Sequence, residues 1–252
     1  RREIWPEAVD RVEHMHCKKY PHIIKEIQEA FQYVRDYKVL PAMRTMQFGG
    51  LAMDVKNERG YNCTFSVANR RAFFAEAMYL LLCGCGVGFS VQRTHTDSLP
   101  AVKHIDRTKV KHFIIPDTIE GWADAVDELM KSFLVTGRYI EFSYHRIRGE
   151  GESLVTSGGK APGHLDLKTS LEAARNVLSG AQGRKLRPIE VFDLMCHFAN
   201  AVVSGGVRRS AMICLFDKDD EEMMTAKTRK NYDIARGINP QRGMANISAL
   251  ME

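Results

Sequence analysis

The sequence lacks any long apolar run. No stretch approaches the ~18–20 consecutive apolar residues that a membrane-spanning helix needs. The first ten residues, RREIWPEAVD, contain neither the apolar segment of a secretory signal nor an initiator methionine. We therefore expect a cytoplasmic protein without a membrane partner, whose given sequence begins downstream of its natural start.

Cysteine is present, but not in the dense pattern of a small secreted domain. The six cysteines are spread between positions 17 and 214 of the 252 residues, which favours a reducing compartment. The formal net charge of +5 is not gathered into long runs of Lys and Arg. A nucleic-acid partner usually requires such a concentrated basic stripe, so we expect no direct contact with nucleic acid.

Helical periodicity is strong at the start of the chain. Residues 7–37 predict helices that are interrupted at Pro21, and Pro41 ends this region. From residue 60 onward, predicted helices alternate with short strands, which is typical of an α/β domain whose sheet is at least partly parallel. We therefore expect a helical layer over residues 1–55, followed by an α/β domain.

Two details of the α/β region can be tested directly. The helix predicted over residues 116–134 has Asp117 as its expected N-cap, with Glu120 three residues later. The strand predicted at residues 210–216, SAMICLF, is almost wholly apolar, which is typical of a strand covered on both faces.

The glycine-rich run CGCGVGF, residues 83–89, does not fit a known binding fingerprint. It follows a predicted helix, whereas a dinucleotide fingerprint follows a strand. Cys83 and Cys85 have no second cysteine pair at zinc-ligand spacing. His14, His16 and Cys17 lie on an amphipathic helix and are better explained as surface and core residues. We therefore expect a tight helix-to-strand turn at residues 83–89 and no metal site.

Three further motifs each allow a structural and a functional interpretation. Cys63 in GYNCTF, residues 60–65, is either a packed core thiol or a redox thiol, and burial alone needs no function. The loop SGGKAPG, residues 157–163, exposes backbone N–H groups around Lys160 and could hold a phosphate. The turn SGGVRRSA, residues 204–211, either ends a helix with solvated arginines or faces an anion. Taken singly, each structural interpretation is favoured.

Together, these motifs resemble a known family. GYNCTF, CGCGVGFSV, SGGKAPG, AVVSGGVRRSAMICLF and NPQRGMANIS, in this order, resemble the catalytic subunit of ribonucleotide reductases. The form VVSGGVRRSA is most similar to the adenosylcobalamin-dependent branch, class II. The resemblance covers the chain from about residue 40 to its end, and five motifs in register are quite specific.

The resemblance implies a fold and an activity. The expected fold is an N-terminal helical region, residues 1–55, followed by the first half of a ten-stranded α/β barrel, residues 56–252, without the second half. The implied reaction is the reduction of ribonucleoside di- or triphosphates to deoxyribonucleotides by thiyl-radical chemistry. The implied cofactor is adenosylcobalamin, with a deoxynucleotide or ATP as effector. A thioredoxin-type reductant, and the C-terminal half of the reductase or a second copy of this chain, are the implied partners.

The resemblance also assigns site residues. Cys63 matches one member of the redox-active cysteine pair, which needs a thiol facing the sugar that can close a disulfide reversibly. Residues 157–163 and 229–243 match the two loops that sense the effector. Asn62, Thr64 and Gly86 are then expected at the substrate, and Lys160, Arg229, Arg236 and Arg242 at the effector.

Part of the family pattern is absent from this sequence. No cysteine lies in the Asn-x-Cys-x-Glu context of the radical-bearing finger loop. We therefore expect the isolated chain not to reduce ribonucleotides, and to act as a split subunit, an intein-related fragment or a truncated piece. A nucleotide-binding regulatory or structural relative without catalysis is one alternative. A thiol-dependent enzyme of another family, with Cys83 and Cys85 as its redox pair, is a second.

Overall fold

The structure is a computed structural model that describes residues 3–153, 160–203 and 211–251. Residues 157–159 of SGGKAPG and residues 204–210 of SGGVRRSA lie outside these ranges. The chain divides into two compact units, with the division between Asn62 and Cys63. The boundary expected after residue 55 falls inside the first unit. In the described ranges, no helix is both long and apolar enough to span a membrane.

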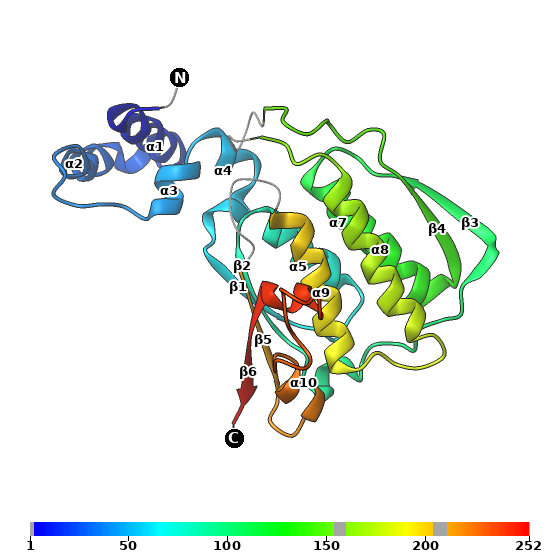
Figure 1. The fold of residues 1–252 in the computed structure, drawn as a ribbon. Helices are drawn as coiled ribbons and strands as arrows, with labels where there is room; N and C mark the ends of the chain where they lie inside the picture. The colour runs from blue at the N-terminus through cyan, green and yellow to red at the C-terminus, as the bar shows by residue number, and fades with distance from the viewer. Residues whose placement is uncertain (1–2, 154–159, 204–210, 252) are drawn as a thin grey trace. The chain divides into compact units, whose positions relative to one another are not determined.

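The first unit is helical, as expected. Helices α1 (Trp5–Lys19) and α2 (Ile24–Arg35) are separated by a short 3-10 turn, η1 (Pro21–Ile23) (Figure 1). Pro21 fits the first position of that turn because proline has no backbone N–H to donate. The two helices bury a small apolar core of their own: Val9, Val12, Met15, Phe31 and Val34.

The region after Pro41 is also helical. It forms three short turns of helix, α3 (Met43–Phe48), α4 (Leu51–Val55) and η2 (Asn57–Gly60). Arg11 of α1 fastens α3, since its guanidinium donates to the Met46 carbonyl at 2.8 Å and to the Gly49 carbonyl. The periodicity of apolar residues cannot predict these contacts, because they join residues far apart in sequence.

The second unit is built on a four-stranded parallel sheet in the order β1-β2-β5-β6. The strands are β1 (Cys63–Val67), β2 (Gly86–Ser90), β5 (Met212–Asp217) and β6 (Ala245–Leu250). Helix α5 (Ala72–Leu82) makes the crossover from β1 to β2, and ends in the predicted glycine turn, where Gly84 has φ +87°. The expected α/β fold with parallel strands is confirmed.

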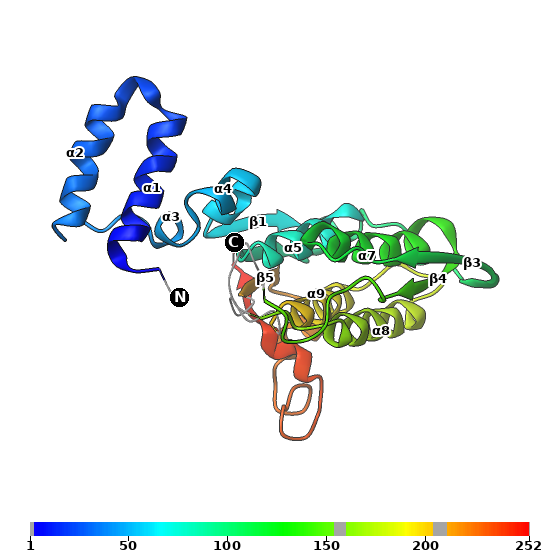
Figure 2. The same cartoon turned by 90° about the horizontal axis from the view of Figure 1, so that it is seen from above.

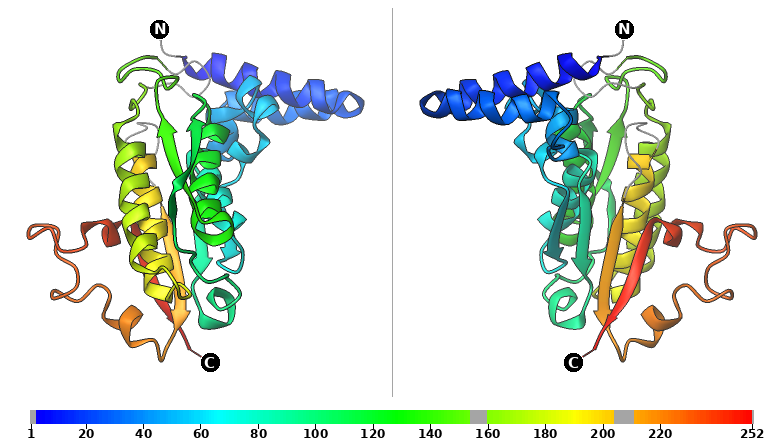
Figure 3. Two further views of the ribbon diagram at one scale, coloured as in Figure 1. Left: turned by 90° about the vertical axis from the view of Figure 1, so that its right-hand side faces the viewer. Right: turned by 90° about the vertical axis from the view of Figure 1, so that its left-hand side faces the viewer.

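Helices α5 and α9 (Pro188–Val203) cover one face of this sheet. Phe89 of β2 is fully buried there, with its ring centroid 6.0 Å from that of Phe73 on α5. The ring centroids of Phe74 on α5 and Phe198 on α9 are 6.4 Å apart. In the right-hand view of Figure 3 the four strands lie in front of these helices. The main core therefore lies between the sheet and one layer of helices.

A second layer of elements extends this core. Helix α7 (Ile119–Lys131) packs on α5, and α8 (Leu165–Gly180) packs on α9. Beside α7 and α8 lies a separate two-stranded parallel sheet, formed by β3 (Asp106–Ile114) and β4 (Arg138–Ser143) (Figure 2). Strand β3 was not predicted because its sequence, DRTKVKHFI, is mostly polar and mostly exposed. The remaining short elements are α6 (Arg93–Thr96), η3 (Ser132–Thr136), α10 (Glu221–Thr225) and η4 (Pro240–Met244).

Two local predictions were wrong. The N-cap of α7 is Thr118, whose hydroxyl accepts from the Gly121 N–H at 2.9 Å, while Asp117 pairs with Arg148 at 2.6 Å. Strand β5 is covered on one face and not on both, since Met212 is buried but Ile213 is 40% exposed.

Candidate active site

Cys63 is the first residue of β1 and its side chain is exposed. It lies beside Gly86, the first residue of β2, in the parallel register Cys63↔Gly86. Paired residues of adjacent strands point to the same face of a sheet, and glycine places no side chain beside the thiol. The structure therefore brings together two of the predicted site residues.

The face that carries Cys63 is open. Phe65 is 56% exposed and Ile213 is 40% exposed, although both are large and apolar. The Phe65 ring lies over Gly88, where an added Cβ would come within 2.9 Å of the ring. We call this surface the open face, and the register of the strands defines it by six residues: Cys63, Phe65, Gly86, Gly88, Ile213 and Asn246.

Thr64, another predicted substrate residue, is not on the open face. Thr64 points the opposite way because side chains alternate along a strand, and its register partner is the buried Val87. Its hydroxyl is buried without a hydrogen-bond partner within the described ranges. Asn62 belongs to the first unit, where its side-chain oxygen accepts a hydrogen bond from Arg44 Nε at 3.1 Å.

The remaining cysteines are less accessible. Cys83 and Cys85 are 1% and 2% exposed, so a dithiol reductant could not reach them without local unfolding, which weakens the alternative that they form a redox pair. Cys196 and Cys214 are fully buried, and desolvation raises the pKa of both thiols, helped by Asp193 for Cys196. Among the described residues, no group of three potential ligands could hold a metal ion.

The four predicted effector cations come from two segments. Lys160 is exposed and its amine lies 3.3 Å from the Ser153 hydroxyl. Arg229 and Arg236 lie on an exposed loop, where Arg236 pairs with Asp233 at 2.7 Å. Arg242, in contrast, is buried and forms an ion pair with Asp193 of α9 at 2.8 Å. The structure therefore separates Arg242 from the exposed cations.

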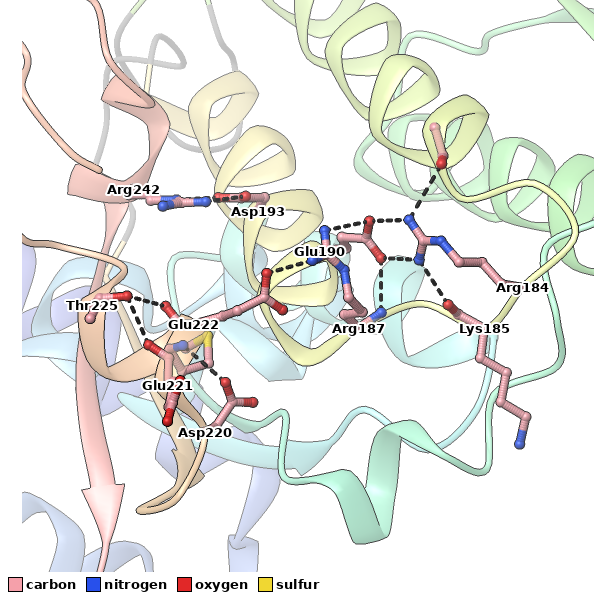
Figure 4. A network of polar contacts seen from close by, with 12 residues as sticks. Arg184, Lys185, Arg187, Glu190, Asp193, Asp220, Glu221, Glu222, Thr225 and Arg242 are labelled. Atoms are coloured by element: carbon pink, nitrogen blue, oxygen red, sulfur yellow. Dashed lines mark hydrogen bonds and ion pairs between the residues drawn. The ribbon is translucent and has the colours of Figure 1, made fainter. Parts of the chain in front are cut away.

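The first turns of α9 hold a second ionic network (Figure 4). Glu190 accepts hydrogen bonds from Arg184 at 2.6 Å and from the Arg187 backbone N–H at 2.9 Å, and Arg187 also pairs with Glu222 of α10. Burial alone would raise the pKa of Glu190, but the hydrogen bonds and charges of these two arginines outweigh it and lower the pKa to about 2. Sequence reasoning did not find this network, since its members lie on three separate segments.

The fold is that of class II ribonucleotide reductase. A solved structure described as a B-12-dependent (class II) ribonucleotide reductase superposes on 99% of this chain and 43% of its own, with a TM-score of 0.85 and 19% identity. No family model matches the sequence.

Proteins similar in sequence are also named as reductases of this kind. The adenosylcobalamin-dependent ribonucleoside-triphosphate reductase of Euglena gracilis is 28% identical over 250 residues, which cover 90% of this chain and 34% of the relative. A probable enzyme of the same name from Dictyostelium discoideum is 35% identical over 130 residues, or 52% of this chain and 16% of the relative. The chain is homologous to part of the adenosylcobalamin-dependent reductases, and it spans about a third of the length of the Euglena relative, so the predicted resemblance is confirmed.

Proposed function

We propose that this chain forms part of a ribonucleotide reductase that makes deoxyribonucleotides in the cytoplasm. The observation that carries the proposal is the exposed Cys63 thiol at the start of a parallel strand, on an open face where its register partner, Gly86, has no side chain. A sugar could approach the thiol there, whereas four of the other cysteines are buried in the core.

In this proposal Cys63 supplies one of the two thiols that reduce the ribose. Two thiols become one disulfide, the C2′–OH bond breaks, the oxygen leaves as water, and hydrogen takes its place. This balances because each thiol gives one electron and one proton. A thiol facing the reacting carbon must be accessible to close the disulfide and to be reduced again by an external dithiol such as a thioredoxin-type protein. The partner thiol and the radical cysteine would come from parts of the enzyme that this chain does not contain.

The open face is the proposed substrate side of the sheet, with Gly86 beside the sugar. Its exposed Phe65 and Ile213 side chains favour coverage by another protein layer, since large apolar side chains are costly to leave in water. We propose that the C-terminal half of the reductase provides that layer. A second copy of this chain is the other candidate.

Adenosylcobalamin would supply the radical that the reaction needs. The described residues offer no cluster of potential metal ligands and no residue that we can assign to a corrin ring. We therefore attribute no step of this chain to the cofactor. A deoxynucleotide or ATP effector would bind at Lys160 and at the exposed part of residues 229–243.

The test is ribonucleoside-triphosphate and -diphosphate reduction with adenosylcobalamin and a dithiol. The chain is assayed alone and mixed with the C-terminal remainder of a related reductase, with Cys63→Ser as the variant and Cys17→Ser as the control. We expect activity only in the mixture, a loss of about a thousandfold or more in Cys63→Ser, and no loss in Cys17→Ser. Turnover that survives Cys63→Ser would contradict the proposal.

The alternative is a nucleotide-binding relative without catalysis. It predicts that effector nucleotides bind the chain while every mixture stays inactive. The exposure of Cys63 argues against it, because a protein with no redox function gains nothing from an unprotected thiol.

A further inference from the structure

Three arginines are buried in the described part of the chain: Arg44, Arg59 and Arg242, which are 4%, 6% and 9% exposed. A buried charge is costly unless an opposite charge lies beside it. Arg242 meets this requirement, since its Nε and one terminal nitrogen each donate to a different carboxylate oxygen of Asp193 at 2.8 Å. Arg44 and Arg59 belong to the first unit, where their surroundings are different.

Arg44 of α3 and Arg59 of η2 lie against the same aromatic ring. Their guanidinium carbons are 5.9 Å and 5.5 Å from the ring centroid of Phe48. Arg44 Nε donates to the side-chain oxygen of Asn62 at 3.1 Å, and one of its terminal nitrogens lies 3.5 Å from the Arg59 carbonyl oxygen. An aromatic ring attracts a cation but carries no net charge, so Phe48 cannot neutralise the charge of either arginine.

Arg59 stands out because none of the described residues accepts a hydrogen bond from its guanidinium or forms an ion pair with it. Arg11 and Arg35 of the same unit are partly exposed, yet each pairs with a carboxylate, at 2.8 Å and 2.7 Å respectively. The usual order is therefore reversed, since the buried arginine lacks the counter-charge that the more exposed ones have. This reversal indicates that Arg59 receives an anion from outside the described residues.

The Arg59 guanidinium still reaches solvent. In the described ranges, the fully buried side-chain nitrogens and oxygens without a partner belong to Trp5, Thr64 and Arg175. The Arg59 nitrogens also have no partner but are not among these atoms, so they keep some exposed surface. A small anionic group can therefore reach the guanidinium.

The two arginines also lie close in sequence to the proposed redox thiol. Asn62, whose side chain accepts from Arg44, directly precedes Cys63. The proposed reductase handles nucleotides, and their phosphate chains carry several negative charges. The planar fork of arginine matches the oxygens of a phosphate, and two positive charges suit a phosphate chain better than a single carboxylate.

We propose that Arg44 and Arg59 form an anion-binding site in the first unit that takes the phosphate groups of a nucleotide. The identity of this ligand rests on the proposed function, whereas the site itself rests on the two buried arginines. The bound phosphates supply the negative charge that Arg59 lacks within the described residues.

The experiment measures binding to the whole 252-residue chain at constant ionic strength, by calorimetry and by thermal melting. The probes are tripolyphosphate, ATP and dATP, each tested separately. The variants are Arg59→Met and Arg44→Met, since methionine keeps a long apolar stem without the charge. The control is Arg35→Met, which removes a partly exposed arginine of the same unit that is already paired.

We expect the wild type to bind all three probes, and both site variants to bind them at least about tenfold more weakly, because charge-assisted hydrogen bonds are lost. Arg35→Met should bind like the wild type. Without any anion, Arg59→Met should melt no lower than the wild type, since it removes a buried charge that has no partner. A purely structural Arg59 would give the opposite result, a lower melting temperature with unchanged binding.

Unchanged binding in Arg59→Met, or no binding of tripolyphosphate by the wild type, would overturn the anion site. Binding of tripolyphosphate but of neither nucleotide would overturn the assignment to a nucleotide. If Arg59→Met does not fold, Arg59→Lys, which keeps the charge without the planar fork, is measured in the same way and should also bind more weakly. The reductase assay with Cys63→Ser is decided independently, so each of these failures leaves the proposed reductase intact.

Discussion

The two faces of the central sheet are made by alternate residues of the same strands, yet they differ in every property that matters for chemistry. On one face Phe89 and Cys214 are fully buried beneath α5 and α9. On the other, Cys63 and Phe65 are exposed beside glycines. A thiol on the covered face can only pack, and a thiol on the open face can react. Position along the strand therefore separates a buried cysteine from an accessible one.

The largest expected effect that separates the two faces is on stability. Phe89→Ala should lower the free energy of unfolding by about 3–5 kcal/mol, because it empties a packed site against Phe73. Phe65→Ala should cost about 1 kcal/mol or less, since more than half of that side chain is already in water. Urea unfolding of the two variants measures both. Equal losses would mean that the open face is as well packed as the covered one.

Thiol reactivity tests the same contrast in the native protein. Cys63 should be alkylated by iodoacetamide at pH 7.5 at least about a hundred times faster than Cys214, because burial excludes the reagent and raises the pKa of Cys214. Mass spectrometry of peptides taken over time gives both rates. Comparable rates would show that the covered face opens readily, and the distinction between the two cysteines would fail.

A smaller effect on stability is expected at low pH, where Glu190 in the first turn of α9 becomes protonated. The Glu190 pKa is lowered in the folded chain from 4.5 to about 2, so its carboxylate stabilises the fold above about pH 4.5 and loses that contribution as pH falls toward 2. Glu190→Gln should therefore be less stable than wild type at pH 6, with the gap narrowing toward pH 3. Thermal melting across this range measures the gap. A gap independent of pH would contradict the assigned ion pairs.

The sequence predicted the parallel α/β unit and the glycine turn after α5, because each leaves a local pattern. Thr64 was expected near the substrate, and its place next to Cys63 in β1 puts its side chain on the opposite face of the sheet from Cys63. Phe65, Gly88 and Ile213 were missed, although alternation from Cys63 and a strand register would have found them. Arg242 was expected at the effector, and no local pattern could reveal its pairing with Asp193.

The most direct test of the role of Cys63 is a single turnover without external reductant. The chain is fully reduced, mixed with the C-terminal remainder of a related reductase, adenosylcobalamin and a ribonucleoside triphosphate, then quenched with an alkylating agent under denaturing conditions. We predict about one deoxynucleotide per active site, with Cys63 in a disulfide and the other five cysteines of this chain alkylated. Product formation with Cys63 still alkylated would contradict its assignment as the reducing thiol.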